Sequence, residues 1–321
     1  MPIAVSARGS GRDSSCRRVS VSYGYTRTGA RPLVLRGLIT LAALMAVLAT
    51  ATLAFSADRF GATTSRAARQ HAVRAIPFDK LKPDDRATVR SILRRTTIYR
   101  RMPIKVIDCD PDMFTLLIRN PHIVANTWEV LGLSKLQMTR VDEGTYQADD
   151  GNGTRGTLRV LSENLGDEAD NRLVLYGEGA YDGKPLLQPI RARCVMLLRS
   201  GSVLETNGRN YVTVRLDSFV QVEQMGLDLL ARTIHPLLGK TADHNFVESM
   251  RFVGDFSRTA ERNPTGIARL ARRLRKVDHH TRGELVELAY DLAQRRRDRD
   301  PETTNDSPRA IKTVRHIGEA K

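Results

Sequence analysis

Cysteine is scarce in this chain, and its scarcity argues against two kinds of protein. Only Cys16, Cys109 and Cys194 occur in 321 residues, too few for a small scaffold held together by disulfides. The chain has no CxxC pair and no His/Cys cluster with the spacing of metal ligands, which argues against a structural zinc site. The sequence therefore predicts no metal and no cofactor.

Acidic residues are scarce as well, but only towards the ends of the chain. The net charge is +15. Residues 1–75 carry 11 Lys and Arg against 2 Asp and Glu, and residues 265–297 carry 9 against 4. Residues 76–264 are nearly neutral, with 26 basic and 25 acidic side chains. Because a neutral body lacks the continuous positive face that a phosphate backbone needs, we expect no specific nucleic-acid partner.

Charge is absent altogether from residues 37–57, "GLITLAALMAVLATATLAFSA". As a helix these 21 residues would extend about 31 Å, enough to cross a bilayer. Arginines ahead of the run favour an amino terminus in the cytoplasm. The run is thus predicted to be a single-pass anchor in the cell membrane with the following domain outside the cytoplasm. The alternative is a signal peptide whose cleavage leaves a secreted or periplasmic protein.

On either side of this run the chain is polar. Residues 1–36 are interpreted as a basic cytoplasmic lead, and residues 58–75 as a linker.

The body of the chain, residues 76–262, combines short helices with a meander of strands. Helical apolar spacing follows Pro83, a β-branched strand is expected over 97–108, and two short helices are expected over 111–132. After Gly132 the apolar period changes to two and turn residues recur. This pattern predicts an antiparallel sheet with one apolar face and one wet face.

The last predicted strand passes directly into a helical pattern. One apolar stripe contains Met225, Leu229 and Ile234, and a second contains Phe246, Met250, Val253 and Phe256. Pro236 and Gly239 are expected to break the helix between the two stripes.

The order of these elements over residues 97–256, and the passage "YVTVRLDSFVQVEQMGLDLL", resemble the START-like, or polyketide-cyclase-like (SRPBCC), helix-grip superfamily. The resemblance implies an α+β fold, in which a curved antiparallel sheet of six to seven strands packs on a long carboxy-terminal helix around an apolar cavity. The residues expected to line that cavity are Leu173, Leu175, Cys194, Met196, Leu198, Val212, Val214, Leu216, Met225 and Leu229.

Three aspartates alternate in "KVIDCDPDMF", and they could suggest an acid cluster for metal or phosphoryl chemistry. That chemistry belongs on parallel sheets with crossover helices, which the meander does not provide. A calcium loop would need a glycine and a closing glutamate where Met113 and Arg119 stand. We expect instead that Asp110 caps a helix starting at Pro111. Asp108 has no assigned role.

Other candidate side chains are given structural roles. His235 and His244 are expected at the surface or at a helix end, and Cys194 in the core without a bridge to Cys109. Arg193 and Tyr211 are expected to face water.

Residues 263–297 are predicted to form basic amphipathic helices packed on the domain, with contact to an anionic membrane surface as the alternative. Residues 298–321 are predicted to be disordered.

The sequence favours an exported or membrane-tethered START-like domain that binds a hydrophobic small molecule, a lipid or a partner without catalysis. The alternatives are a cyclase or hydrolase using the same cavity, and a structural envelope protein. No oligomeric state is predicted.

Overall fold

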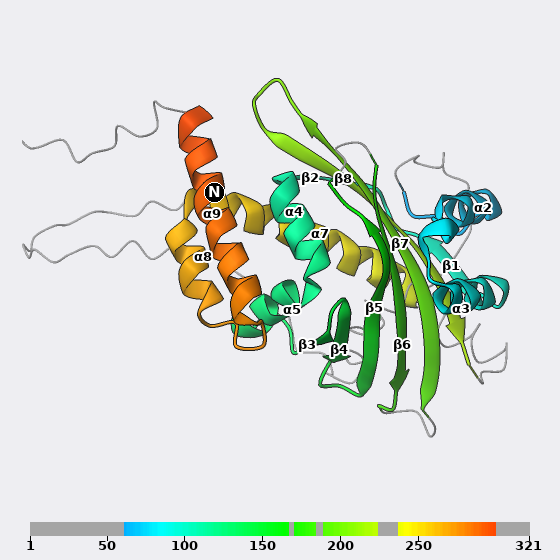
Figure 1. Cartoon of the computed structure of the whole chain (residues 1–321). Helices are drawn as coiled ribbons and strands as arrows, with labels where there is room; N and C mark the ends of the chain where they lie inside the picture. The colour runs from blue at the N-terminus through cyan, green and yellow to red at the C-terminus, as the bar shows by residue number, and fades with distance from the viewer. Residues whose placement is uncertain (1–60, 167–169, 184–188, 224–236, 300–321) are drawn as a thin grey trace, which may run out of the picture. The chain divides into compact units, whose positions relative to one another are not determined.

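A computed structural model describes residues 61–166, 170–183, 189–223 and 237–299. Helices flank a large antiparallel sheet, so the α+β class is confirmed (Figure 1). The described helices are α2 (Arg66–Ala75), α3 (Pro83–Arg94), α4 (Pro111–Arg119), α5 (Pro121–Val130), α7 (Leu237–Arg262), α8 (Pro264–Ala271) and α9 (His279–Arg299), with a short 3-10 turn at Phe78–Lys80. The strands are β1 (Ile98–Arg101), β2 (Lys105–Asp108), β3 (Gln137–Asp142), β4 (Thr145–Asp149), β5 (Thr154–Asn164), β6 (Asn171–Tyr181), β7 (Ile190–Leu204) and β8 (Asn210–Val222).

The strand order is β1-β8-β7-β6-β5-β4-β3, every neighbouring pair is antiparallel, and β2 also pairs with β8. The first predicted strand is therefore split into β1 and β2, which follow each other along the same edge of β8. Pro103 lies in the interruption and has no backbone N–H to continue the ladder. The chain thus places its first and last strands side by side, and β3 forms the opposite edge.

One face of the sheet, here called the inner face, points towards α4, α5 and α7. Leu173, Leu198, Val212 and Val214 pack there with α4 and with the predicted apolar stripe of α7. Gly254 marks the closest approach, because a Cβ at this position would lie 3.2 Å from the carbonyl oxygen of Asp108 in β2. Helix α7 is therefore held directly against the edge strand.

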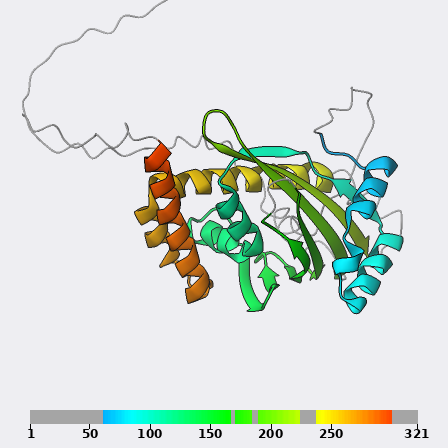
Figure 2. The ribbon, with the colours of Figure 1, turned by 45° about the horizontal axis from the view of Figure 1, so that its top comes forward.

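The opposite face, here called the outer face, is not simply wet, and this part of the prediction is wrong. Val174, Val195, Leu197 and Phe219 are buried there against apolar side chains of α2 and α3. Figure 2 shows these two helices on the other side of the sheet from α4 and α5. The burial of both faces is clearest in β7, where five consecutive residues, 194–198, are buried.

The prediction of a linker over residues 58–75 is also corrected by the structure. Its second half is the helix α2, which is capped by the Ser65 hydroxyl and buries Ala68 and Ala72. The small side chains that suggested a spacer instead allow α2 to pack closely against the sheet.

Helix α7 runs from Leu237 to Arg262, so Gly239 lies inside it and does not interrupt it. Pro236, the other residue of the predicted break, lies outside the described residues. Met225, Leu229 and Ile234 lie outside the described residues. The packed carboxy-terminal helices are confirmed: Ile267, Leu274, Val277, Leu285 and Leu292 of the α8–α9 region join the same core as α7.

In the described parts of the chain, no helix has the length and apolar character needed to cross a membrane. The uncharged run 37–57 and the tail beyond residue 299 lie outside those parts.

Candidate functional site

Eight of the ten residues expected to line a ligand cavity share the inner face. The register shows why, since Leu173 lies opposite Leu198 and Leu198 opposite Leu216, while Leu175 lies opposite Met196. The remaining members of the eight are Cys194, Val212 and Val214. Met225 and Leu229 lie outside the described residues.

These residues fall into two apolar clusters joined at the middle of the sheet. One cluster contains Leu173 and Leu198 and is covered by α4 and α7, and the other contains Cys194 and Met196 and is covered from α5. Leu175 and Leu216 contact both clusters and are only partly buried. At the junction of the two clusters, the described part of the inner face therefore leaves these two leucines partly exposed.

Trp128 of α5 borders this junction. It packs against the second cluster, and its ring meets that of Phe252 in α7 edge to face at 5.6 Å. Both aromatic side chains are partly buried. Trp128 is the only tryptophan of the chain.

Two hydroxyl groups interrupt the apolar inner face. Ser200 lies two positions beyond Leu198 on β7, and Ser218 lies two positions beyond Leu216 on β8. Because Leu198 and Leu216 are directly opposite and the strands are antiparallel, the serines lie on opposite sides of this leucine pair. Both side-chain oxygens are buried and have no hydrogen-bond partner. The sequence analysis missed them, although their positions in the alternating pattern place them on the apolar side.

A charged pair closes one side of the inner face. Arg100 of β1 lies opposite Ser218 and forms an ion pair with Asp243 of α7 through its Nε, 2.8 Å from the carboxylate, and through a second nitrogen. The pair is mostly shielded from water, so it fixes α7 to the first strand.

Cys194 is buried and forms no disulfide with Cys109, as expected, and Cys109 is buried as well. Burial raises the pKa of Cys194 to about 12, and burial also raises the pKa of Cys109. Neither side chain is a thiolate at neutral pH, so neither fits the role of a nucleophile.

His122, at the start of α5, is completely buried and neither of its ring nitrogens has a hydrogen-bond partner. Its ring lies 5.2 Å from that of Tyr146. Burial lowers the pKa of His122 to about 4, against a smaller opposing effect of Asp278. His122 is therefore neutral at physiological pH. His244 is exposed on α7, as expected, and His235 lies outside the described residues.

The three aspartates at the end of β2 serve as a helix cap and as partners of arginines. Asp110 caps α4 by accepting hydrogen bonds from the backbone N–H groups of Asp112 and Met113, which confirms its predicted role. Asp108 pairs with Arg209, and Asp112 pairs with Arg295 of α9 at 2.9 Å. No group of three His, Cys, Asp or Glu side chains in the described residues is placed to hold a metal ion.

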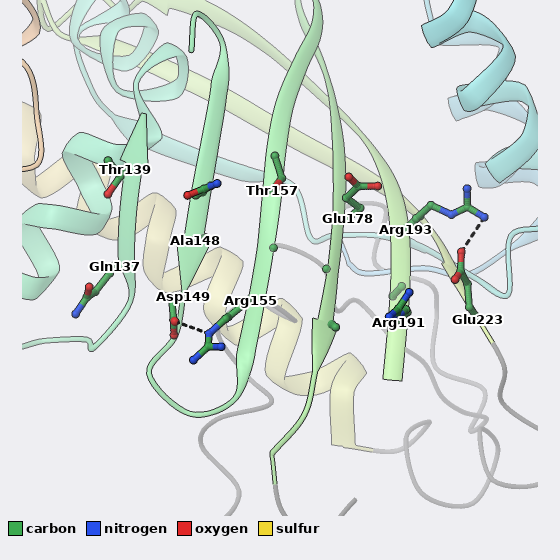
Figure 3. A pocket seen from close by; sticks show the side chains of 15 residues that line it. Gln137, Thr139, Ala148, Asp149, Arg155, Thr157, Glu178, Arg191, Arg193 and Glu223 are labelled. Atoms are coloured by element: carbon green, nitrogen blue, oxygen red, sulfur yellow. Dashed lines mark hydrogen bonds and ion pairs between the residues drawn. The ribbon is translucent and has the colours of Figure 1, made fainter. Parts of the chain in front are cut away.

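A concave region lies on the outer face, beyond the cover of α2 and α3. It is an open groove of about 720 Å³ across β3 to β7 (Figure 3). Its lining mixes polar and apolar groups, and its charges are largely matched, since Asp149 pairs with Arg155 at 2.9 Å and Arg193 pairs with Glu223 at 2.8 Å. Arg193 and Tyr211 both lie on the outer face rather than on the inner face, and both are partly exposed to water.

Comparison with known proteins adds little to this geometry. No protein-family description matches the chain, and no curated protein matches it. Among solved structures, a conserved protein from Geobacillus kaustophilus is similar with 11% identity and a TM-score of 0.26, covering 46% of this chain and 91% of its own. A hypothetical protein from Helicobacter pylori has 13% identity and a TM-score of 0.29, covering 64% of this chain and 99% of its own. Similarity at this level carries no argument about function.

Proposed function

We propose that this chain is a START-like helix-grip domain, exported or tethered to the membrane by residues 37–57, that binds a hydrophobic small molecule or lipid on its inner face without catalysis. The support for the fold family is the order of elements: strand, two short helices, meander and long helix. The pairing of β8 with both β1 and β2 also supports it, since it allows one sheet to curve around α7.

The observation that carries the binding proposal is the pair of orphan hydroxyls on an apolar surface. A buried hydroxyl without a partner costs about 1–3 kcal/mol. Ser200 and Ser218 both carry this cost, and they flank the partly buried residue Leu216. A mainly apolar ligand with a polar group would cover Leu175 and Leu216 and accept or donate a hydrogen bond at one serine.

The inner-face chemistry favours binding over turnover. Arg100 and Asp243 neutralise each other, and Cys194 is protonated at neutral pH. A cyclase or hydrolase would need an acid or base directed at the ligand. The hydroxyls of Ser200 and Ser218 have no adjacent base in the register of the sheet, where Ser218 lies between Met196 and Arg100.

The single tryptophan offers a direct test in the full-length protein. Trp128 borders the junction of the apolar clusters, so cis-parinaric acid bound there should accept energy from it. We expect saturable transfer at one probe per chain. Leu216→Phe, which fills the junction, should weaken binding at least tenfold. Val141→Phe, on the exposed edge strand β3, should not.

A hydroxyl variant refines the same experiment. If the probe carboxylate bonds Ser218, then Ser218→Ala should weaken binding about fivefold, which is the loss of one hydrogen bond of about 1 kcal/mol. Ser200→Ala tests the other end of the leucine pair. Unsaturable transfer, or equal loss in Leu216→Phe and Val141→Phe, would remove the basis of the proposal.

A further inference from the structure

Three arginines gather on the outer face, between the sheet and α2. Arg199 of β7 lies directly opposite Arg215 of β8, and Arg101 of β1 lies directly opposite Asp217, the next residue of β8 on the same face. Side chains directly opposite each other in an antiparallel pair lie about 5 Å apart at Cβ, where like charges repel. The register of the sheet therefore forces this arginine cluster, defined as Arg101, Arg199 and Arg215, around one acid.

That acid, Asp217, is fully buried and completely engaged. One carboxylate oxygen accepts hydrogen bonds from the Tyr99 hydroxyl at 2.6 Å and from Arg101 Nε at 2.7 Å. The other accepts from Arg199 at 2.9 Å. A single carboxylate thus binds two of the three guanidinium groups and neutralises one positive charge.

Arg215, the third arginine of the cluster, forms no hydrogen bond with Asp217. It has no hydrogen-bond or ion-pair partner among the described residues, and its Nε, like that of Arg199, is buried without an acceptor. Arg172 of β6, opposite Arg199, adds no spare charge because it pairs with Asp170. The cluster carries two positive charges more than its acid balances.

Helix α2 supplies the wall above the cluster. Arg101 donates to the carbonyl oxygen of Ala68 at 3.1 Å, and the Nδ1 atom of His71 lies 3.4 Å from the same guanidinium. Burial and the charges of Arg199, Arg101 and Arg215 lower the pKa of His71, so at neutral pH it adds no further positive charge. Burial and the charge of Arg199 likewise lower the pKa of Arg215.

We propose that the arginine cluster is a binding site for a phosphate group. A guanidinium presents its N–H groups in a planar fork that matches phosphate oxygens. A phosphate held by Arg215 and the free Nε of Arg199 would satisfy both buried donors and offset the repulsion that the register imposes. The site is on the opposite face of the sheet from the proposed apolar ligand, so it stands independently of that proposal.

Two sources of phosphate fit this chemistry: a soluble phosphate or phosphomonoester, and the phosphodiester of a lipid headgroup. The headgroup source rests on the proposed membrane tether. Thr63 pairs with the backbone of Arg101, and it follows the uncharged run 37–57 by six residues, which extend at most about 20 Å. A headgroup at the end of an inserted run would therefore lie within reach of the cluster.

Calorimetric titration of the full chain separates these sources. The probes are inorganic phosphate and glycerophosphoglycerol, a soluble phosphodiester headgroup, with chloride at matched ionic strength as the reference. Saturable binding that favours phosphate assigns a soluble ligand, and binding that favours the diester assigns a headgroup. In either case Arg215→Gln should weaken binding at least tenfold. Arg272→Gln, which removes an exposed charge next to α8, should leave binding unchanged.

Thermal unfolding supplies a second measurement that does not rely on the heat of binding. Without anion, Arg215→Gln should melt no lower than the parent, because it removes an unpaired charge. The preferred probe should raise the Tm of the parent and not that of the variant. Absence of binding by both probes, equal loss in Arg272→Gln, or a lower Tm of Arg215→Gln without anion would overturn the proposal.

Discussion

Arg209, which directly precedes the last strand, binds both carboxylate oxygens of Asp108, with its Nε 3.0 Å from one and a terminal nitrogen 2.8 Å from the other. This pair gives Asp108 the structural role that the sequence left open. Arg258 of α7 lies 3.8 Å from the same carboxylate, and Glu261 lies 3.8 Å from Arg209. The end of β2 is thus tied to the β7–β8 hairpin and to α7.

The Asp108–Arg209 pair predicts a measurable coupling. Asp108→Asn, Arg209→Gln and the double variant should give a coupling free energy of about 1 kcal/mol in urea unfolding, since the pair is bidentate but partly solvated. A coupling near zero would show that the two side chains act separately.

Adding Mg²⁺ or Ca²⁺ should leave the Tm unchanged, and a large rise would instead indicate an acidic metal site.

The Asp110 cap predicts a modest loss of stability on its removal. Asp110→Ala should lower the free energy of unfolding by about 1 kcal/mol, because two backbone N–H groups of α4 lose their acceptor. Asp110→Asn keeps an acceptor oxygen and should lose less than half of that amount. Equal losses in the two variants would show that the charge of Asp110, rather than the cap, carries its contribution.

His122 predicts a pH dependence of stability. Its pKa is about 4 in the folded protein and about 6.5 when unfolded, so the unfolded chain binds a proton more readily between these values. The stability should therefore fall by about 3 kcal/mol as the pH drops from 6.5 to 4 and should be level above 7.

His122→Phe is the matched variant for this effect, because neither ring nitrogen has a hydrogen bond to lose and the nearest carboxylate, that of Asp278, lies 4.0 Å away. Burial raises the pKa of Asp110 and of Glu261, which shifts the dependence of both proteins equally. The difference between parent and His122→Phe across pH 4 to 7 isolates the histidine. Parallel stability curves would contradict a buried neutral His122.

Two glycines in helices test how closely α7 lies against β2. Gly283→Ala in α9 has open space around it and should stabilise the protein by about 1 kcal/mol through helix propensity. Gly254→Ala would place its methyl group 3.2 Å from the Asp108 carbonyl oxygen and should gain less, and Gly254→Val should destabilise the protein. Equal gains from the two alanine variants would mean that α7 does not contact β2. Chemical denaturation of the three variants measures these changes.

Local patterns were enough to predict much of this architecture. Alternation placed Leu173, Cys194, Met196 and Val214 on one face, because a strand allows only two side-chain directions. Asp110 and Pro111 marked the start of α4, because capping depends on neighbouring residues alone. The apolar stripe of α7 was equally readable from its helical period.

Features that depend on contacts distant in sequence were missed. The small residues of α2 resembled a linker, and only the burial of Ala68 and Ala72 shows that they pack the helix against the sheet. The meeting of Arg101, Arg199 and Arg215 depends on the register of three strands. The pairing of Asp108 with Arg209 spans 101 positions. The orphan hydroxyls of Ser200 and Ser218 likewise became meaningful only once the absence of partners for these atoms was known.

Native mass spectrometry of the full chain, purified directly from its cells, tests the central claim most directly. The account predicts a small apolar adduct at one per chain that is retained in Val141→Phe and lost in Leu216→Phe. A chain that carries no adduct in any of the three forms, and that acquires none when cis-parinaric acid is added, would contradict a ligand on the inner face.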